Sequence, residues 1–375
     1  MGNNMCKAEA EADAHKISKQ TFTLDKVIGR GGFGKVWHVQ NKKTGKYYAM
    51  KEMSKNRIIT KRSVNSVMNE QKLLLTLRHP FLVNMRYAFQ NSETLYLVMD
   101  LMKGGDLRYH IGSKRRFTEE EVKFIVACII VALEYLHTNS IIHRDIKPEN
   151  LVLDEQGYVR VTDLGIARIW NPENSSETSG TPGYMAPEVM CRQNHNISVD
   201  YFAVGVICYE FMMGKRPYIG KSRKDIRDNI FAKQVKIKKS QIPDGWSIEC
   251  ADFINKLLQR KPCNRLGYNG PEELKQHKWL RSIEWQLLID KKLPAPFVPK
   301  TGVDNFDEKQ ANSPDKWQEE NKELLDQNEE LLRRNSIQNL FGGYDFDLDD
   351  IRKEEIIKKR KDKAQVKDEP LDDKE

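Results

Sequence analysis

The sequence predicts an α+β fold in which a strand-rich N-terminal part precedes a larger, mainly helical part. Between residues 22 and 102, short stretches of alternating apolar and polar residues are separated by glycine-containing turns, which is typical of antiparallel strands. Residues 124–137 and 198–211 are apolar nearly all round, as buried helices are. The length of 375 residues suggests roughly two to three domains, enough to bury a core.

The composition excludes several classes of protein. The net charge is +8, but 62 basic residues stand against 54 acidic ones, a weaker bias than nucleic-acid binders show, so no nucleic-acid partner is expected. Six cysteines are spread singly without a C-x-x-C pair, which favours reduced intracellular thiols. No apolar run reaches the roughly 20 residues of a membrane span, and the N-terminus lacks a signal sequence. We therefore expect a cytoplasmic protein, and a monomer.

The first strands enclose a glycine-rich turn. Strand patterns at residues 22–28 and 35–39 flank G-R-G-G-F-G, and a third follows at 47–51. Glycine at 29, 31 and 34 would let the backbone approach phosphate oxygens. The same motif occurs in dinucleotide-binding folds, where a helix follows it; here a strand follows, which favours a hairpin that covers a nucleotide.

The rest of the N-terminal part adds a helix and two strands. Residues 63–75 carry apolar positions at helical spacing and include Glu70. We expect Glu70 to form an ion pair with Lys51 when this helix is correctly rotated. Residues 78–85 and 94–101 are predicted to be the strands that complete the sheet.

The stretch H-R-D-I-K-P-E-N at residues 143–150 concentrates chemistry in a loop after the first apolar helix. Asp145 could accept a proton from a hydroxyl, Lys147 could meet an anion, and Asn150 offers an amide oxygen to a divalent metal. Asp163 follows thirteen residues after Asn150 and gives a carboxylate for an ion such as Mg²⁺. Metal chelation, anion neutralisation and proton acceptance together are the requirements of phosphoryl transfer.

These residues resemble the catalytic loop and metal-binding triplet of the eukaryotic protein kinases, and the matching motifs occur in order from residue 22 to 282. The resemblance implies a two-lobed kinase fold, with an antiparallel-sheet N-lobe at 22–102 and a helical C-lobe at 103–282. It implies ATP and Mg²⁺ as cofactors and transfer of the γ-phosphoryl to serine or threonine hydroxyls of protein substrates.

By the same resemblance, Asp145, Lys147, Lys51 and Glu70 are the catalytic set, and Asn150 and Asp163 hold the metal. The residues expected to contact the nucleotide lie in the glycine hairpin, the next strand, the hinge and the start of the C-lobe: Ile28, Gly29, Arg30, Gly31, Gly32, Phe33, Gly34, Lys35, Val36, Ala49, Lys51, Met99, Asp100, Met102 and Val152.

The segment G-T-P-G-Y-M-A-P-E resembles that of the AGC group, whose members are activated by phosphate on a threonine three residues before its first glycine. In this chain that position is Glu177. We expect Arg144 and Arg168 to pair with this carboxylate and to give basal activity without an upstream kinase. Thr178 is the competing phosphorylation site.

Several other residues have expected roles. Thr181 should hydrogen-bond Asp145 and Lys147 and favour serine or threonine acceptors, and Asp200 should cap the backbone of the catalytic loop. A structural ion pair is expected between Arg265 and Glu188.

Acidic residues at 106, 149 and 210 are expected near the peptide groove, where they would favour basic residues upstream of the acceptor. The alternative is a solvated acidic surface, which fits Glu149 and Glu210 less well because both match positions that bind substrate arginine in basophilic relatives. Gly183 replaces an acidic residue common there, which weakens the expected preference.

Residues 283–375 resemble an AGC-type C-terminal extension with a charged end. Phe306 would lie by the adenine pocket, and an amphipathic helix with apolar residues at 317, 324 and 331 would dock on its own domain. Phe341, Tyr344 and Phe346 resemble the hydrophobic tail motif, with Asp345 at its phosphorylatable position, and would stabilise the Glu70 helix. The alternative is an unrelated disordered tail. The segments at residues 79–84, 104–110 and 283–299 resemble, more finely, the YANK subfamily.

The N-terminal leader, residues 1–21, allows two interpretations. Gly2 and Cys6 could both be acylated, which would give peripheral membrane contact, or the leader is simply disordered. A membrane-tethered adaptor or pseudokinase scaffold is the alternative function. A dead scaffold would have lost Lys51, Asp145 or Asp163, and all three are present.

Overall fold

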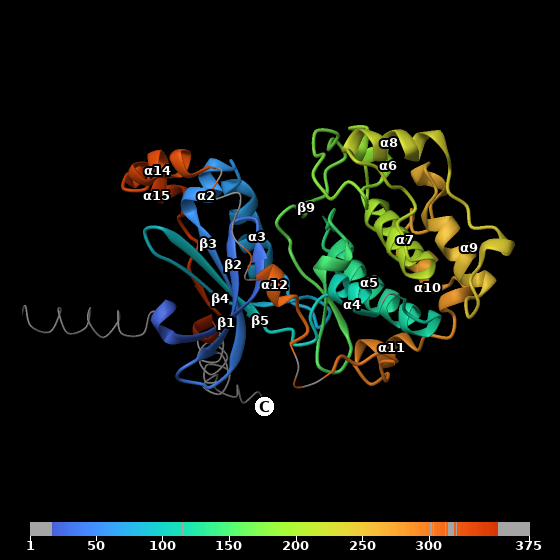
Figure 1. Ribbon diagram of the computed structural model, residues 1–375, viewed down its shortest axis with the longest axis horizontal. Helices are drawn as coiled ribbons and strands as arrows, with labels where there is room; N and C mark the ends of the chain where they lie inside the picture. Colours follow the sequence, from blue (N-terminus) through green and yellow to red (C-terminus); the bar gives the residue numbers. More distant parts are fainter. Residues whose placement is uncertain are drawn as a thin grey trace, which may run out of the picture. The chain divides into compact units, whose positions relative to one another are not determined.

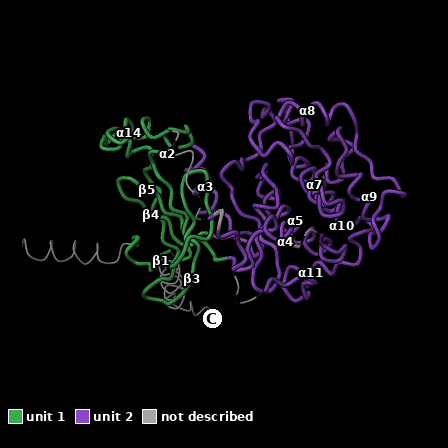
Figure 2. Tube along the Cα trace, in the orientation of Figure 1, with its two compact units in different colours: residues 1–64, 85–101, 312–375 green, residues 65–84, 102–311 purple. Residues whose placement is uncertain are grey.

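The computed structural model describes residues 17–114, 116–300, 302, 304–311, 313, 319 and 321–351. The positions expected to be acylated, Gly2 and Cys6, and the apolar residue Trp317 lie outside these ranges. The chain divides into two compact units, drawn in green and purple in Figure 2. The first comprises residues 1–64, 85–101 and 312–375, and the second comprises 65–84 and 102–311.

The first unit is built on one antiparallel sheet. Its strands follow the order β1-β2-β3-β5-β4-β10 and are β1 Phe22–Gly31, β2 Gly34–Asn41, β3 Tyr47–Ser54, β5 Thr94–Asp100, β4 Met85–Gln90 and β10 Phe346–Asp347. The strand predicted at residues 78–85 is wrong, because the strand starts at Met85. Phe81, Leu82 and Val83 belong to the second unit and are buried there for another reason, because Leu82 bridges to Val161 of the same unit.

One face of this sheet carries the core. Phe22, Val39, Met50, Tyr87, Phe89, Tyr96 and Val98 form a buried cluster. Phe22 stacks on Phe89 with ring centroids 6.1 Å apart, and Phe89 stacks on Tyr96 at 4.8 Å. Because side chains alternate across a strand, the residues between these positions point to the other face of the sheet.

Helices from opposite ends of the chain pack together in the first unit. Helix α14, drawn in orange-red, lies beside α2 in Figure 1. The Nδ2 atom of Asn56 in α2 (Lys55–Thr60) donates to the carbonyl of Leu325 in α14 (Lys322–Leu331), at 2.6 Å. Asn328 donates to Thr60 at 2.8 Å. The amphipathic helix therefore docks on its own domain as predicted, although Leu324 is exposed.

The segment after α14 continues across the same unit. Helix α15 (Asn335–Gln338) leads into the short turn η6 (Asn339–Phe341), and Phe341 and Tyr344 are fully buried. Strand β10 then pairs with β4, with Phe346 opposite Ala88. This part of the tail is ordered against the sheet, which contradicts the alternative of an unrelated disordered tail.

The second unit is mainly helical. Its helices are α3 Val64–Thr76, which begins in the first unit, α4 Leu107–Lys114, α5 Glu119–Thr138, α6 Pro187–Met190, α7 Ser198–Met213, α8 Arg223–Ala232, α9 Ile248–Leu257, α10 Glu272–Lys275, α11 Trp285–Ile289 and α12 Glu308–Ala311. The α5 and α7 helices are buried on most sides, as their apolar sequences predict. Thr118 caps α5 by accepting from Glu121 N, and Glu121 reciprocates on Thr118 N.

Two small antiparallel pairs position the loops of the second unit. Strand β6 (Ile141–Ile142) pairs with β9 (Arg168–Ile169), and β7 (Leu151–Leu153) pairs with β8 (Val159–Val161). The expected α+β fold is thus confirmed, with the six-stranded sheet in the first unit and most of the helices in the second. Within the described part of the chain, no helix is both long and apolar enough to cross a membrane.

Candidate active site

The carboxylate of Asp145 is held from both sides. Its Oδ2 accepts from Lys147 Nζ at 2.6 Å and from Asn150 Nδ2 at 3.2 Å. Its Oδ1 accepts from the Thr181 amide at 3.0 Å and from the Thr181 hydroxyl at 2.7 Å. Two donors on each oxygen fix the orientation of the carboxylate, as a proton acceptor requires.

Lys147 links the loop to the segment that ends in A-P-E. Its ammonium donates to Thr181 Oγ1 at 2.9 Å as well as to Asp145. The predicted hydrogen bonds of Thr181 to both residues are therefore present. They place one cation and one anion side by side, next to a hydroxyl-bearing side chain.

Asp200 binds the backbone amides at the start of the loop that carries Asp145. It is almost completely buried and accepts from the amides of His143, at 3.0 Å, and Arg144, at 2.8 Å. Burial alone would raise the pKa of Asp200, but the hydrogen bond and charge of His137 outweigh it, and the pKa lies below its usual value. The expected capping role is confirmed, and it supports Arg144 at a φ of 68°.

The two predicted metal ligands are brought together by the β7–β8 hairpin. The Thr162 amide donates to the Asn150 carbonyl at 3.0 Å, so Asn150 and Asp163 adjoin the same end of the hairpin. The Asn150 amide nitrogen is engaged by Asp145, which leaves the side-chain oxygen as its metal-binding atom. Asp163 adopts a φ of 66°, a strained conformation common at functional sites.

This donor set fits Mg²⁺ but not a protein-only metal cage. One carboxylate and one amide oxygen are hard ligands, and Mg²⁺ is usually bound by one or two such groups together with phosphates and water. Among the described residues, no group of three or more His, Cys, Asp or Glu side chains could hold a metal ion. Asn150 and Asp163 could therefore hold such an ion only together with ligands from outside the protein.

The glycine-rich turn lies in the first unit, at the tip of β1 and β2. Lys61 Nζ donates to the Gly32 carbonyl at 2.7 Å, and the Ser54 amide donates to the Phe33 carbonyl at 3.1 Å. A Cβ atom on Gly34 would lie 1.9 Å from the Glu52 carbonyl oxygen, so this position needs glycine for the fold itself. A Cβ on Gly32 would meet nothing within 4 Å, so this glycine is not explained by packing.

The strand register places the remaining nucleotide candidates of this unit on one face. Val36 lies opposite both Gly29 and Lys51, and Ala49 lies opposite Met99. Residues that pair directly share a face of an antiparallel sheet, and this face is opposite to the aromatic core. A Cβ on Gly31 would lie 3.9 Å from Lys51 Cε, so the lysine stem passes beside the glycine turn.

Four other nucleotide candidates in the first unit have partners within the sheet, or lie at an irregularity of a strand. The Asp100 carboxylate is bound by Arg86, with Arg86 Nε 2.7 Å from Oδ1. Arg30 pairs with Lys35 across the hairpin, and the Lys35 ammonium lies over the Trp37 ring. Ile28 lies at the register shift between Val27 and Gly29 in the pairing of β1 with β2.

In the second unit, Met102 and Val152 are connected through the backbone. The Met102 carbonyl accepts from the Gly105 amide at 3.4 Å, and Asp106 bridges to Val152 in β7. Gly104 N donates to the Leu153 carbonyl at 2.9 Å. A Cβ on Gly105, whose φ is 71°, would lie 1.8 Å from the Asn305 carbonyl oxygen, which explains this glycine.

Glu70 is buried on α3 next to the Asp163 triplet. A Cβ on Gly165 would lie 3.8 Å from Glu70 Oε2 and 3.2 Å from Asp163 Oδ1. The neighbouring Asn69 donates to the Ala167 carbonyl at 3.0 Å. Helix α3 is thereby attached to the start of the segment that follows Asp163, while the ion pair of Glu70 with Lys51 stays a prediction.

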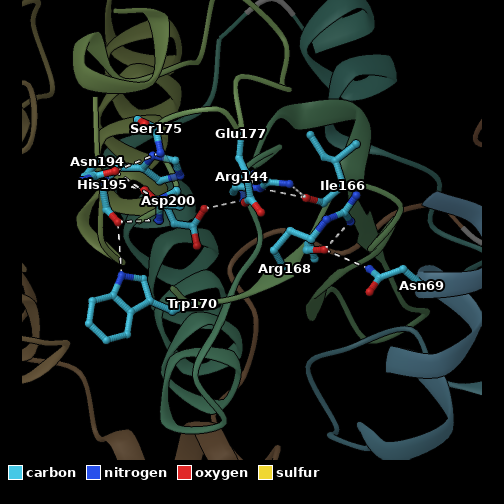
Figure 3. A network of polar contacts seen from close by, with 12 residues as sticks. Asn69, Arg144, Ile166, Arg168, Trp170, Ser175, Glu177, Asn194, His195 and Asp200 are labelled. Carbon is cyan, nitrogen blue, oxygen red and sulfur yellow. Dashed lines mark hydrogen bonds and ion pairs between the residues drawn. The ribbon is translucent and has the colours of Figure 1, made fainter. Parts of the chain in front are cut away.

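The predicted pair of Arg144 and Glu177 is present. Figure 3 shows the Glu177 side chain pointing at the Arg144 guanidinium, and Nη1 lies 2.6 Å from Oε2. Arg144 also donates from Nε to the Ile166 carbonyl at 2.8 Å. Burial lowers the pKa of Arg144, an effect that the attraction of Glu177 opposes. Arg168 instead donates to the Ala167 carbonyl, so its expected pairing with Glu177 is wrong.

Two of the acidic residues expected near the peptide groove bind an arginine, Arg108, that the sequence analysis did not single out. Arg108 on α4 donates from Nε to Glu149 Oε1 and from Nη1 to Glu210 Oε1, both at 2.9 Å. It also donates to the Tyr184 hydroxyl, which in turn donates to Glu210 at 2.6 Å. Nothing in the local sequence around Arg108 indicates these contacts, because its partners come from three other segments.

Comparison with known proteins agrees with this arrangement. Residues 22–280 match the family described as the protein kinase domain. The chain belongs to this family.

The predicted ion pair of Arg265 with Glu188, at 2.6 and 2.9 Å, is buried between α6 and the turn at Pro262–Asn264.

Relatives extend the match beyond the family. The chain is 40% identical over 313 residues to a probable serine/threonine-protein kinase of Dictyostelium discoideum, covering 81% of this chain and 68% of that protein. It is 39% identical to human ribosomal protein S6 kinase alpha-2, over 76% of this chain and 39% of the relative. It is 34% identical to a cAMP-dependent protein kinase catalytic subunit-like protein of Caenorhabditis elegans, over 80% and 76%. These relatives support membership of the AGC group.

Proposed function

We propose that this chain is an active serine/threonine kinase that transfers the γ-phosphoryl of ATP to protein hydroxyls, with a weak preference for basic residues upstream of the acceptor. The observation that carries the proposal is the fixed Asp145 carboxylate, bound by Lys147 and Thr181 in a chain of the kinase family. Within the AGC group, we propose the YANK subfamily on the sequence resemblance alone.

Each site residue has its own role in the proposed phosphoryl transfer. Asp145 orients the serine or threonine hydroxyl and takes its proton as the oxygen bonds to the γ-phosphorus and the bond to the ADP oxygen breaks. Lys147 forms an ion pair with Asp145 and offsets the negative charge of its carboxylate. Asn150 and Asp163 would hold Mg²⁺, which neutralises the phosphate charge when bound. Lys51 and the glycine turn would hold the phosphates, and Glu70 would position Lys51.

The pseudokinase and adaptor alternatives are weaker. A scaffold would not require the four hydrogen bonds that orient the Asp145 carboxylate or the conformation of Asp163. Acylation of Gly2 and Cys6 would be compatible with either function. Mass spectrometry of the native protein tests it, and an unmodified N-terminus would exclude it.

An arrayed library of serine-, threonine- and tyrosine-containing peptides tests the proposal. The wild-type protein, with ATP and Mg²⁺, should phosphorylate serine or threonine peptides, and Asp145→Ala should not. Labelling of tyrosine peptides alone, or equal labelling by both proteins, would contradict it.

We also propose that Glu177 replaces an activating phosphate. The contact between Glu177 and Arg144 requires no modification. A carboxylate carries less charge and fewer acceptor oxygens than a phosphate, so it would give basal rather than full activation. Asp345 would act similarly in the tail, where its charge attracts Lys55.

A further inference from the structure

The acidic cluster of the second unit consists of Asp106, Glu149 and Glu210, and Arg108 joins Glu149 and Glu210 to each other and to Tyr184. Glu149 belongs to the short turn Pro148–Asn150, directly after the loop that carries Asp145 and Lys147. The Tyr184 amide donates to the carbonyl of Thr181, the residue bound to Asp145, at 2.9 Å. The cluster therefore adjoins the residues that would hold the acceptor hydroxyl, where the flanking residues of a substrate peptide must pass.

Two carboxylates of this cluster are arranged around one guanidinium. Arg108 donates from Nε to Glu149, from Nη1 to Glu210 and from Nη2 to Tyr184. Each nitrogen of the planar guanidinium therefore has a hydrogen-bond partner. Although burial alone would lower the pKa of Arg108, its bond with Glu210 raises it, and the side chain stays charged. Glu210 is buried, whereas the Glu149 side chain is 44% exposed.

The other charges around the cluster leave only a modest negative excess. Asp106 interacts with Glu149, whose charge raises the pKa of Asp106 together with burial, the larger cause. A second cation, Arg216, lies over the Tyr184 ring, 5.8 Å from its centroid. Its Nη1 also fills the space above Gly183, where a Cβ would be 1.9 Å away. Two of the three carboxylates are thus bound by Arg108, and a second guanidinium lies against Tyr184.

We propose that Arg108 occupies the place that an arginine of the substrate would otherwise take between Glu149 and Glu210, and so sets how strongly this kinase selects basic residues. This inference rests on the proposed function. A substrate arginine must compete with a tethered guanidinium that already satisfies both carboxylates. The wild-type enzyme then selects arginine only weakly, through Asp106 and the exposed part of Glu149.

Removing Arg108 should create strong selectivity. In Arg108→Met, Glu149 and Glu210 lose their cation, and a substrate arginine gains two charged hydrogen bonds. The ratio of kcat/KM for matched serine peptides with arginine or alanine at each upstream position should be below about threefold in the wild type. It should rise to about tenfold or more at one position in Arg108→Met, which corresponds to 1.4 kcal/mol. The double variant Arg108→Met, Glu210→Gln should lose most of this gain.

Controls separate this effect from damage to the fold. Arg227→Met removes an exposed arginine on α8 and should leave the ratio unchanged. Arg108→Lys keeps a cation opposite the buried Glu210 but lacks the planar fork, so it should fold and give an intermediate ratio. Melting temperatures identify any variant that unfolds.

Two results would overturn the inference. One is a wild-type enzyme that already selects arginine more than about threefold at one upstream position. The other is a ratio that stays at the wild-type value in folded Arg108→Met, or in Arg108→Lys if the methionine variant unfolds. If the wild-type enzyme phosphorylates no serine or threonine peptide at all, the proposed function itself fails, whatever the variants do.

Discussion

At the scale of single residues, this site depends on side chains that hold each other's orientation. Asp145 is fixed by Lys147 and Thr181, and Arg144 is fixed by Glu177 and by the backbone of Ile166. The roles of Asp145, Lys147 and Thr181 could be predicted because all three belong to motifs that resemble those of the protein kinases. The role of Arg108 could not be predicted, because no motif includes it and its acidic partners are 41 and 102 residues away in the sequence.

The carboxylate of Glu177 should support activity without phosphorylation. Glu177→Ala leaves the buried Arg144 guanidinium without its anionic partner, so the phosphorylation rate should fall about tenfold, the factor expected for one charged hydrogen bond. Thr178→Ala should change the rate little, and Glu173→Ala, at an exposed carboxylate of the same segment, is the control. Steady-state kinetics of phosphatase-treated protein measures this. Loss of activity both on phosphatase treatment and in Thr178→Ala would mean that Thr178 is the true switch.

The His79 imidazole should make stability depend on pH. Its ring stacks on Tyr135 at 4.6 Å, and Nδ1 accepts from the Phe81 amide at 3.3 Å, which requires the neutral ring. Burial lowers the pKa of His79 to about 4. The unfolded chain binds a proton at higher pH than the folded one, so the contribution is complete above pH 6.5 and is lost as the pH falls toward 4.

Because His79 is partly exposed, the expected loss is about 1 kcal/mol after allowance for solvent screening. Denaturant unfolding at pH 7 and pH 5 should show a smaller difference in His79→Gln than in the wild type. An identical pH dependence in both proteins would show that His79 does not titrate as proposed.

At the scale of elements, the C-terminal segment is the least predictable part of the first unit. Docking of the amphipathic helix followed from its sequence, but β10 is only two residues long and carries no strand pattern of its own. Strand β4 was misplaced because the apolar residues Phe81–Val83 are buried against β8, where Val83 N donates to the Val161 carbonyl. Burial by another element produces the same apolar run as a strand does.

The tail motif should stabilise the first unit through Phe341. Its ring is fully buried and lies 5.0 Å from the ammonium of Lys55, which also donates to the Asn91 carbonyl and to Gln338. Phe341→Ala should lower the free energy of unfolding by about 3 kcal/mol. The adjacent Leu340 is 47% exposed, so Leu340→Ala should cost less than about 0.5 kcal/mol. Equal effects of the two substitutions in thermal unfolding would show that the tail does not pack as described.

At the scale of the whole molecule, the fold class was predictable because strand and helix patterns are separated along the sequence. The two units, however, are each assembled from distant segments, with residues 312–375 joined to the first unit. The order of catalytic motifs identified the family, since each motif needs its own strand, turn or loop.

The most direct test of catalysis is the initial rate of phosphate transfer from ATP to a serine peptide, measured for wild type and Asp145→Asn, with Mg²⁺ and with excess EDTA. Wild type with Mg²⁺ should form phosphoserine and ADP in equal amounts, whereas EDTA should abolish transfer. The Asp145→Asn rate should be lower by about 100-fold or more. Transfer at the same rate in Asp145→Asn, or none in the wild type with serine and threonine peptides of any sequence, would contradict the assignment of Asp145 as the catalytic acceptor of the hydroxyl proton.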